Sequence, residues 1–384
     1  MSRSRIIRAS NEEEAQPDMA AVALEDRFDF GSREYLELFA SSSATAFQHP
    51  LWLQSLFEKL APERGAEKIV VTARDPASNR LILVLPLVRR RKRGIVLLEA
   101  SDLGVSDYAA PVAAPGLMLG PELQMAIRST LPSHDLLRIR PIRAEHLPAW
   151  QACLGGDASR LDFSAHAAPL GGDVALWRDE KLSPGFRRRL DRKKKRFLKQ
   201  PEASVRLLTE AGEIRSAISG IARLRAGRFN PDMIQNGYVE DFYADIAERG
   251  QQAGFARTYA ISVGGETIGY AFGIAHAGCF NYLLIGCDYE RHGRHSPGLI
   301  LYDFMIEDWI SEGGSLFDFT IGDESFKMEF GTEATAMYEL SRRQTWRGRI
   351  AAAAFAFRER LRRPSKASGI GEKSGEEDRH GETA

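Results

Sequence analysis

Residues 280–298 read FNYLLIGCDYERHGRHSPG, and this stretch decides how the second half of the chain folds. It begins as an apolar run typical of a buried strand, and it ends at a Pro-Gly pair of the kind that starts helices. The helix expected next, residues 298–312, is apolar on all but one narrow stripe and stops at Gly313-Gly314. The stretch therefore predicts a strand, a polar loop and a buried scaffold helix.

Further elements on both sides of this stretch predict a mixed sheet in the second half. We expect strands at 204–208, 255–263, 266–275, 316–321 and 337–345, with helices at 211–228, 238–249 and 348–363. Gly264-Gly265 joins two of these strands as a two-residue hairpin turn. Such hairpins preclude a simple doubly wound parallel sheet, so the pattern predicts an α/β (α+β) fold with helices on a mixed sheet.

The first half has a similar layout. A helix is expected at 47–60, where proline lies near the start of an apolar stripe. Strands are expected at 68–74, 80–89, 95–100 and 136–139, and a helix at 121–131. We therefore predict two tandem domains, residues 25–175 and residues 176–363. The polar segments 1–24 and 364–384 are expected to be disordered.

Composition limits the possible functions. The 384 residues are 43% hydrophobic and 27% charged, with zero net charge, so the whole molecule is not a generic polyanion binder. Three widely spaced cysteines exclude a disulfide framework and offer no zinc signature, so we expect no metal. Residues 1–18 lack the apolar segment of a signal peptide, and no run is long enough to span a bilayer. We expect a cytoplasmic protein.

Four short motifs occur in a fixed order along the chain. They are Phe47-Gln48-His49-Pro50-Leu51-Trp52, Ser106-Asp107-Tyr108 followed by Pro111, Ser296-Pro297-Gly298-Leu299, and Phe317-Asp318-Phe319 leading to Gly322-Asp323-Glu324 and Lys327. With these motifs the chain resembles the GNAT acyltransferase superfamily. More specifically, it resembles the branch named for the cellulose-biosynthesis protein CelD, which is related to the FemABX aminoacyl ligases. The resemblance covers roughly residues 30 to 345 and implies two GNAT-like domains, with acetyl-CoA as co-substrate of the second.

The loop 288–298 is the expected cofactor site. Its small residues and the start of a helix would direct backbone N–H groups and a partial positive charge at a phosphate. In the superfamily the corresponding loop binds the CoA pyrophosphate. The residues expected to contact the cofactor are Arg291, Arg294, His295, Ser296, Gly298 and Leu299. The alternative is a solvent-exposed loop with a Pro-Gly helix start.

The strand at 316–321 carries a carboxylate. Period-2 alternation places Asp318 with Thr320 on one face and Phe317 with Phe319 on the other. Asp318 is either a general base or a structural ion pair, for instance with Lys327. We expect it to be buried, with a raised pKa. The loop after the strand adds Asp323 and Glu324 as further catalytic candidates, whereas Phe326 stands where the family usually has a tyrosine.

Residues 185–197 form a basic helix with eight cationic residues and one aspartate. We expect it at the junction of the two domains, where it would bind an anionic substrate, a tRNA or an anionic membrane rather than the cofactor. The alternative is a solvated charged face. A second basic cluster, residues 89–93, lies at an expected hairpin tip. Substrate contacts are predicted from Asp107, Tyr108, Arg188, Arg192, Lys195 and Lys327.

The sequence thus favours a GNAT-type acyltransferase that acetylates nitrogen or oxygen of a small-molecule or glycan-linked acceptor. Transfer would be direct, because the one thiol–imidazole combination, Cys287 with His292 and His295, shows no sign of an activated cysteine. Two alternatives stay open. One is a FemABX-like ligase that uses aminoacyl-tRNA, and the other is a non-catalytic module that binds polyanions.

Overall fold

The computed structural model describes residues 20–228 and 232–362. Within them the strands are β1 (Ala21–Leu24), β2 (Ala66–Arg74), β3 (Leu81–Lys92), β4 (Ile95–Ala100), β5 (Val112–Ala113), β6 (Leu136–Arg143), β7 (Asp157–Pro169), β8 (Ser204–Leu207), β9 (Ala256–Val263), β10 (Glu266–His276), β11 (Cys279–Cys287), β12 (Leu316–Ile321) and β13 (Glu333–Arg343). They form one mixed sheet in the order β1-β2-β3-β4-β6-β13-β7-β12-β11-β10-β9-β8, and β5 pairs with β3.

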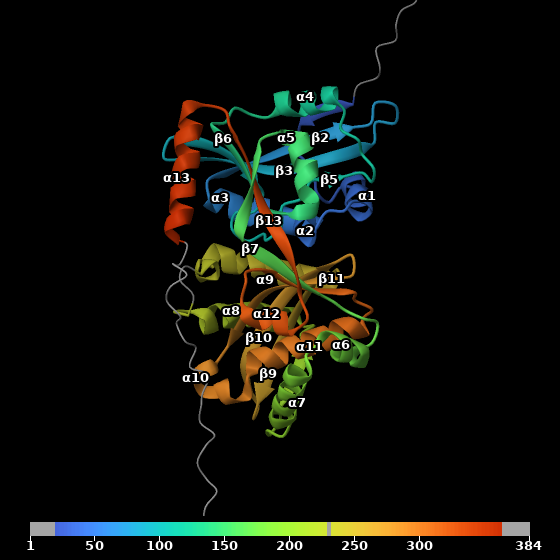
Figure 1. The fold of residues 1–384 in the computed structure, drawn as a ribbon, viewed down its shortest axis with the longest axis vertical. Helices are drawn as coiled ribbons and strands as arrows, with labels where there is room; N and C mark the ends of the chain where they lie inside the picture. Colours follow the sequence, from blue (N-terminus) through green and yellow to red (C-terminus); the bar gives the residue numbers. More distant parts are fainter. Residues whose placement is uncertain (1–19, 229–231, 363–384) are drawn as a thin grey trace, which may run out of the picture.

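The helices cover both faces of this sheet (Figure 1). They are α1 (Arg33–Ser41), α2 (Pro50–Ser55), α3 (Ala61–Glu63), α4 (Pro121–Thr130), α5 (Leu147–Leu154), α6 (Val174–Lys181), α7 (Pro184–Leu198), α8 (Ala211–Arg225), α9 (Gly237–Gln252), α10 (Tyr289–His292), α11 (Pro297–Ser311), α12 (Ser325–Glu329) and α13 (Trp346–Arg362). Short helical turns are η1 (Ala46–Gln48), η2 (Leu56–Leu60), η3 (Ala144–His146), η4 (Met233–Gln235) and η5 (Gly293–His295). The predicted α/β fold with helices on a mixed sheet is confirmed.

Local sequence signals account for several of these elements. The β9–β10 hairpin turns at Gly264 and Gly265, whose φ angles of +61° and +77° match the predicted two-residue turn. Helix α7 begins where the Ser183 side chain accepts a hydrogen bond from the Phe186 N–H and Pro184 occupies the first turn. The turn and the helix start lie where the sequence predicts them, because the residues that determine each of them lie within a few positions.

The two halves are joined through β7 and β13, which cross side by side between them (Figure 1). Strand β7 pairs with β13 along most of its length, and its end, from Ala165 to Pro169, pairs with β12. Strand β13 in turn pairs with β6 of the first half. The sequence grouped residues 333–362 with the second half, whereas β13 and α13 pair and pack with strands of the first. The boundary at residue 175 stays a prediction.

Three large apolar clusters hold the layers together. The first joins α2 with α8 and α9 across both halves, through Trp52, Phe242 and their neighbours. The second packs α7 and α11 onto β9–β12, and the third packs α4 and α5 onto β2–β6. Because the first cluster contains residues from both halves, the halves share one core on that face.

The chain ends differ in part from the expectation. Residues 21–24 were expected to be disordered, but they form β1, which pairs with Thr72 and its neighbours in β2. The short apolar run Ala21–Leu24 gains a partner strand that local composition does not reveal. Residues 1–19 and 364–384 of the expected disordered segments lie outside the described residues.

Candidate active site

Strands β11 and β12 part to leave a cavity in the second half. They pair in parallel only from Cys279 to Asn281 on β11 and from Leu316 to Asp318 on β12. Beyond these residues lies a cavity of ≈ 380 Å³. Its walls come from α8, β11, α10, α11, β12 and α12, and they include Arg225, Tyr282, Ile285, Tyr289, Tyr302, Thr320, Glu324 and Lys327. A hollow of this size between separating strands can hold a small ligand.

Both strands are irregular where they border the cavity. On β12, Thr320 has a φ of +59°, and the pairing with β7 shifts register between Asp318 and Ile321. A β-branched residue in the left-handed region is strained, and such strain concentrates at functional sites. On β11, Leu283 is an extra residue in the pairing with β10. The predicted alternation of β12 therefore ends at Phe319, because the bulge turns Ile321 to the opposite core.

Asp318 is buried, as predicted, and it is held by three donors. Its carboxylate accepts hydrogen bonds from the Tyr108 hydroxyl at 2.9 Å, from Arg143 at 2.9 Å and from the Thr320 N–H at 2.7 Å. Burial raises the pKa of Asp318, while Arg143 opposes that rise. The ion-pair partner is therefore Arg143 of β6 rather than the expected Lys327. The carboxylate links both halves of the chain, but its acceptor positions are occupied.

Asp107 lies next to this cluster and is less enclosed. Its side chain is partly exposed and is hydrogen-bonded to Thr320, a residue that lines the cavity. Burial raises its pKa from 3.8 to about 7, with the Thr320 hydrogen bond opposing the rise and Asp318 adding to it. Because its pKa lies near neutrality, Asp107 can both accept and release a proton there.

The loop after β12 separates the other predicted carboxylates. Glu324 lines the cavity with its side chain 58% exposed, and it is paired with Lys327 at 2.9 Å. Asp323 instead accepts hydrogen bonds from His166 Nε2 at 2.8 Å and from the Ser164 N–H at 3.2 Å. Both partners belong to β7. Of these two residues, only Glu324 is therefore brought to the cavity wall.

Lys327 is buried, and its ammonium group is hydrogen-bonded to the end of β12. Its Nζ lies 2.9 Å from the Ile321 carbonyl oxygen, 3.0 Å from that of Gly322 and 2.9 Å from the Glu324 carboxylate. A lysine ammonium has three N–H donors, and these acceptors take all of them. Lys327 thus shapes the cavity wall, and the sequence prediction that it contacts substrate remains untested.

The predicted cofactor loop lies at the start of α11. The Ser296 hydroxyl accepts a hydrogen bond from Lys193 at 2.6 Å and makes no cap to α11, so the first turn of this helix lacks a side-chain cap. A Cβ placed on Gly298 would lie 2.3 Å from the Tyr289 hydroxyl. The glycine therefore allows Tyr289 to cover the helix start.

The other residues of the loop face different partners. Arg291 forms a two-pronged ion pair with Glu266 at the surface, and Arg294 donates to His295 Nε2 at 3.1 Å. His295 is buried, and Leu299 is half-buried against the core of the second half. Of the expected cofactor residues, Ser296 and Gly298 therefore lie at the helix start, while Arg291 is engaged elsewhere.

Helix α7 does not lie at the junction of the halves. Its apolar stripe of Phe186, Leu190 and Phe197 is buried in the core of the second half, which draws the helix onto α11 at the outer end of the molecule (Figure 1). Lys193 on this helix bonds Ser296 of the cofactor loop. The predicted position was therefore wrong, and the basic helix borders the expected cofactor site. Three of its predicted substrate residues are exposed: Arg188, Arg192 and Lys195.

Cys287 is not an activated nucleophile. Burial raises the pKa of its thiol to about 12, so the thiol stays protonated at neutral pH. The rings of His292 and His295 lie 6.0 Å apart between centroids and are tilted by 31°. Within the described residues, no cluster of histidine, cysteine, aspartate or glutamate has the geometry to hold a metal ion.

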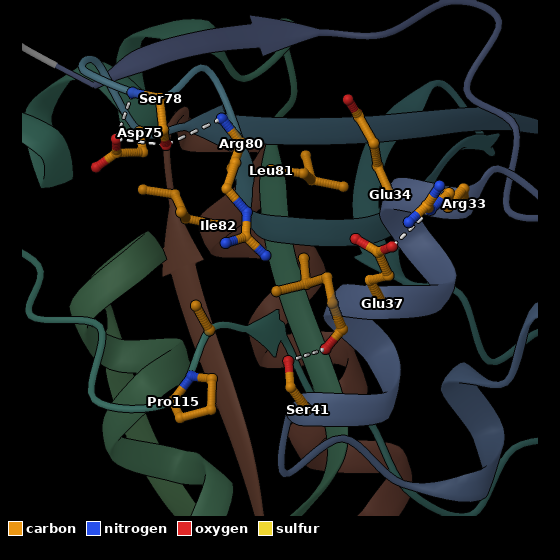
Figure 2. Close-up of a pocket in the computed structure, with 12 residues that line it drawn as sticks. Arg33, Glu34, Glu37, Ser41, Asp75, Ser78, Arg80, Leu81, Ile82 and Pro115 are labelled. Atoms are coloured by element: carbon orange, nitrogen blue, oxygen red, sulfur yellow. Dashed lines mark hydrogen bonds and ion pairs between the residues drawn. The ribbon is translucent and has the colours of Figure 1, made fainter.

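A second hollow, of ≈ 590 Å³, lies in the first half between α1 and the turn after β2 (Figure 2). In it Arg33 forms an ion pair with Glu37 at 2.7 Å, and Asp75 accepts a hydrogen bond from the Ser78 hydroxyl at 2.7 Å. None of its lining residues belongs to β11, β12 or the loop before α11. It therefore shares no group with the cavity described above.

Sequence reasoning missed Arg143 and His166, and it also missed Arg225 and Arg228 of the cavity wall. Arg225 pairs with Asp232 and donates to the Ile285 carbonyl at 3.1 Å, and Arg228 stacks over the Tyr289 ring at 4.2 Å. Arg225 is the last residue of α8, which packs against β11, and Arg228 lies in the turn that follows this helix. Sequence spacing alone gives no signal for the contacts with Ile285 and Tyr289, because these two partners lie about sixty residues away.

Comparison with known proteins supports a GNAT-type assignment. The protein is similar in structure to FemX, with a TM-score of 0.60 at 10% identity over 86% of this chain and 99% of that chain. It is also similar to L-PGS from Bacillus licheniformis, with a TM-score of 0.54 at 12% identity over 87% of this chain and 97% of that one. At such identities these likenesses concern the fold alone. No curated protein matches the sequence. Residues 184–328 match the acetyltransferase (GNAT) domain family, and the fold is accordingly of the GNAT type.

Proposed function

We propose that this chain is an acyltransferase that moves an acyl group, most simply acetyl, from a CoA thioester to an amine or hydroxyl. The observation that carries the proposal is the separation of β11 from β12, which opens a cavity beside the uncapped start of α11. The cavity would hold the thioester and the acceptor. The helix start would hold the phosphates.

The start of α11 suits a pyrophosphate for two reasons. Its first N–H groups lack a side-chain cap, and the helix dipole places partial positive charge there. Lys193 adds a cation on the Ser296 hydroxyl. Burial lowers the pKa of the neighbouring His295, and the charges of Arg294, His292 and Arg196 lower it further, so Arg196 also lies near the helix start. Tyr289 covers Gly298 and would move aside or stack on the ligand.

The free edge of β11 would polarise the thioester carbonyl. The Ile285 carbonyl accepts a hydrogen bond from Arg225, so this residue presents its backbone polar groups away from β10. In an extended strand the N–H and C=O of one residue point to the same side. The N–H of Ile285 therefore lies on the edge that borders the cavity. A backbone donor at this edge would stabilise negative charge on the carbonyl oxygen during attack.

We assign the general base to Asp107 rather than to Asp318. Asp318 already accepts from Tyr108, Arg143 and Thr320, and it would position the segment that carries Asp107. Attack by the acceptor nitrogen or oxygen would form the new bond to the acyl carbon and break the carbon–sulfur bond, while the acceptor proton passes to Asp107. Because Phe326 offers no phenol, the leaving thiolate would take its proton from water or from a tyrosine of the cavity wall, such as Tyr289.

The resemblance to the CelD-like branch favours a small-molecule or glycan-linked acceptor of the cell envelope. The three cysteines are free, which fits a reducing cytoplasm. The described residues contain no helix that is both long and apolar enough to cross a membrane.

A second candidate is a FemABX-like ligase in which aminoacyl-tRNA is the donor. The observation that favours it is the position of α7, whose exposed Arg188, Arg192 and Lys195 extend the positive charge beyond what a pyrophosphate requires. A tRNA would use these cations along its backbone. Binding to polyanions without any transfer would instead make the chain a non-catalytic module.

A thermal-shift series separates the candidates. Acetyl-CoA and CoA should raise the melting temperature if the site binds them, because a ligand of the folded state stabilises it. Uncharged tRNA should raise it in a steeply salt-dependent way if α7 serves a tRNA donor. ATP and inorganic pyrophosphate serve as controls for unspecific phosphate binding.

A further inference from the structure

Helix α13 carries an apolar stripe that faces solvent. Trp346, Ile350 and Phe357 are exposed by 67%, 56% and 63%. At 3.6 residues per turn these three side chains lie within about 40° of one another on the helix. Three large apolar side chains on one exposed face are unusual for a protein surface and mark an interaction site.

The opposite face of α13 packs the helix against the first half of the protein. Ala351, Ala352 and Phe355 pack on Ile95, Leu97 and Leu136 of β4 and β6. Figure 1 shows α13 along the flank of the first half, with its other side open. The exposed stripe therefore contributes nothing to the docking of the helix, and another partner must account for it.

Cations surround the exposed stripe. Arg347 and Arg349 are exposed and flank it on either side of the helix. The tip of the β3–β4 hairpin adds Arg91, Lys92 and Arg93, all exposed. This is the second basic cluster of the sequence, and no part of the proposed transfer reaction uses it.

The hairpin tip and α13 form one surface. Lys92 and Arg93 line a small hollow of ≈ 120 Å³ together with Ala351, Ala354 and Phe355 of α13. Arg91 and Arg347 both help to lower the pKa of Asp135, after the hydrogen bonds that this carboxylate accepts from Thr345 and Val96. We call this combination of the tip (residues 91–93) and the outer face of α13 the basic–apolar face.

We propose that the basic–apolar face binds the surface of a membrane that contains anionic lipid. Helix α13 would lie flat, with Trp346, Ile350 and Phe357 in the boundary between headgroups and acyl chains. Arg347 and Arg349 would extend to the phosphates on either side, and the hairpin tip would add further charge. The inference is independent of the donor and acceptor proposed above.

The chemistry of the face favours a membrane over two other partners. RNA would be bound by the cations, but Ile350 and Phe357 would add little on a phosphate surface. A second copy joined face to face would bring the same cations against one another, because a two-fold interface pairs identical patches. A membrane surface with anionic lipid is the partner that can bind both the cations and the apolar stripe.

The test is sedimentation of the full chain with vesicles at about 0.1 M salt. One set of vesicles contains phosphatidylcholine alone, and the other contains equal parts of phosphatidylcholine and phosphatidylglycerol. An apolar variant, Ile350→Ser with Phe357→Ser, is compared with Met118→Ser and Met125→Ser, two other exposed residues (86% and 65%). A charge variant, with alanine at 91, 92 and 93, is compared with Arg188→Ala, Arg192→Ala and Lys195→Ala on α7.

We expect the wild type to bind only the vesicles with phosphatidylglycerol. The apolar and charge variants should each lose at least about tenfold in partitioning, and both controls should bind like the wild type. The proposal is overturned if the wild type ignores these vesicles, or if the α7 control loses as much as the tip variant. It is also overturned if the apolar variant binds the vesicles normally, because binding would then depend on charge alone, as expected for an RNA partner. A dimer that light scattering detects and that this variant dissociates would overturn it as well.

Discussion

Replacing Asp107 with asparagine should abolish most of the activity and at the same time stabilise the protein above neutral pH. Asparagine keeps the shape of the side chain and an oxygen that can still accept from Thr320. It removes the group that we propose takes the acceptor proton. Loss of a positioned general base lowers turnover by about 10²–10⁴-fold, while donor affinity should stay unchanged.

The gain in stability follows from the direction of the pKa change. The pKa of Asp107 rises from 3.8 to about 7 in the folded protein, mainly through burial. Between these two pH values the folded state holds a proton that the unfolded state releases, so folding loses stability as pH rises. Above pH 7 the ionised Asp107 costs at most about 4 kcal/mol, and below pH 4 the cost is absent. The asparagine variant should therefore gain stability at pH 8 and none at pH 4.

Urea unfolding and initial rates, measured from pH 4 to pH 9, check both statements. The wild-type kcat/KM should rise through pH 7 and then level off. Asp102→Asn is a matched control, because burial raises the pKa of Asp102 to about 6, yet this carboxylate accepts its hydrogen bond from the Gly104 N–H and not from Thr320, the cavity-lining partner of Asp107. This variant should be more stable than the wild type above pH 6, and it should keep its activity. Full turnover by Asp107→Asn, or a wild-type rate that ignores pH in this range, would refute the assignment.

Three further perturbations test the donor site and the cavity wall. Gly298→Val should lower CoA affinity at least about tenfold in calorimetry, since the start of α11 has no room for a Cβ. The circular dichroism spectrum should stay unchanged. Unchanged affinity would show that the phosphates bind at another place. Reversing Arg188, Arg192 and Lys195 to glutamate should weaken donor binding at low salt, with the difference shrinking at high salt; a loss restricted to the acceptor KM would separate α7 from the donor. Lys327→Met should lower the free energy of unfolding by about 2–4 kcal/mol in urea because it leaves buried carbonyls unpaired; a change below about 0.5 kcal/mol would show that these bonds matter little.

The sequence predicted those parts of the fold whose signals are local. The β9–β10 hairpin, α11 and β12 were predicted correctly because glycine turns and apolar periodicity act within a few residues. Strand β7 was missed: residues 157–169 are rich in alanine, serine and aspartate and end in proline, a composition with low β-propensity. It is a strand because β12 and β13 pair with it, and that pairing is a tertiary effect.

In the candidate site, too, the residues with local sequence signals were predicted and their partners far away in the chain were not. Asp107, Tyr108 and Asp318 were each singled out from short motifs, and the structure brings them together. Their shared partner Arg143 was missed because it is one of several arginines along β6 and lies 175 residues from Asp318 in the chain. Helix α7 was misplaced because its charge was given more weight than its apolar stripe, which decides where it packs.

The central claim is that the cavity between β11 and β12, with the start of α11, binds a CoA thioester that Asp107 helps to transfer. Calorimetric titration of the wild type and of Asp107→Asn with acetyl-CoA tests it most directly. We predict one site per chain, with the same dissociation constant in both proteins and, in a parallel rate assay, turnover that is about 10²–10⁴-fold lower in Asp107→Asn. Absence of any acetyl-CoA binding by the wild type, together with tight and salt-dependent binding of tRNA, would contradict it.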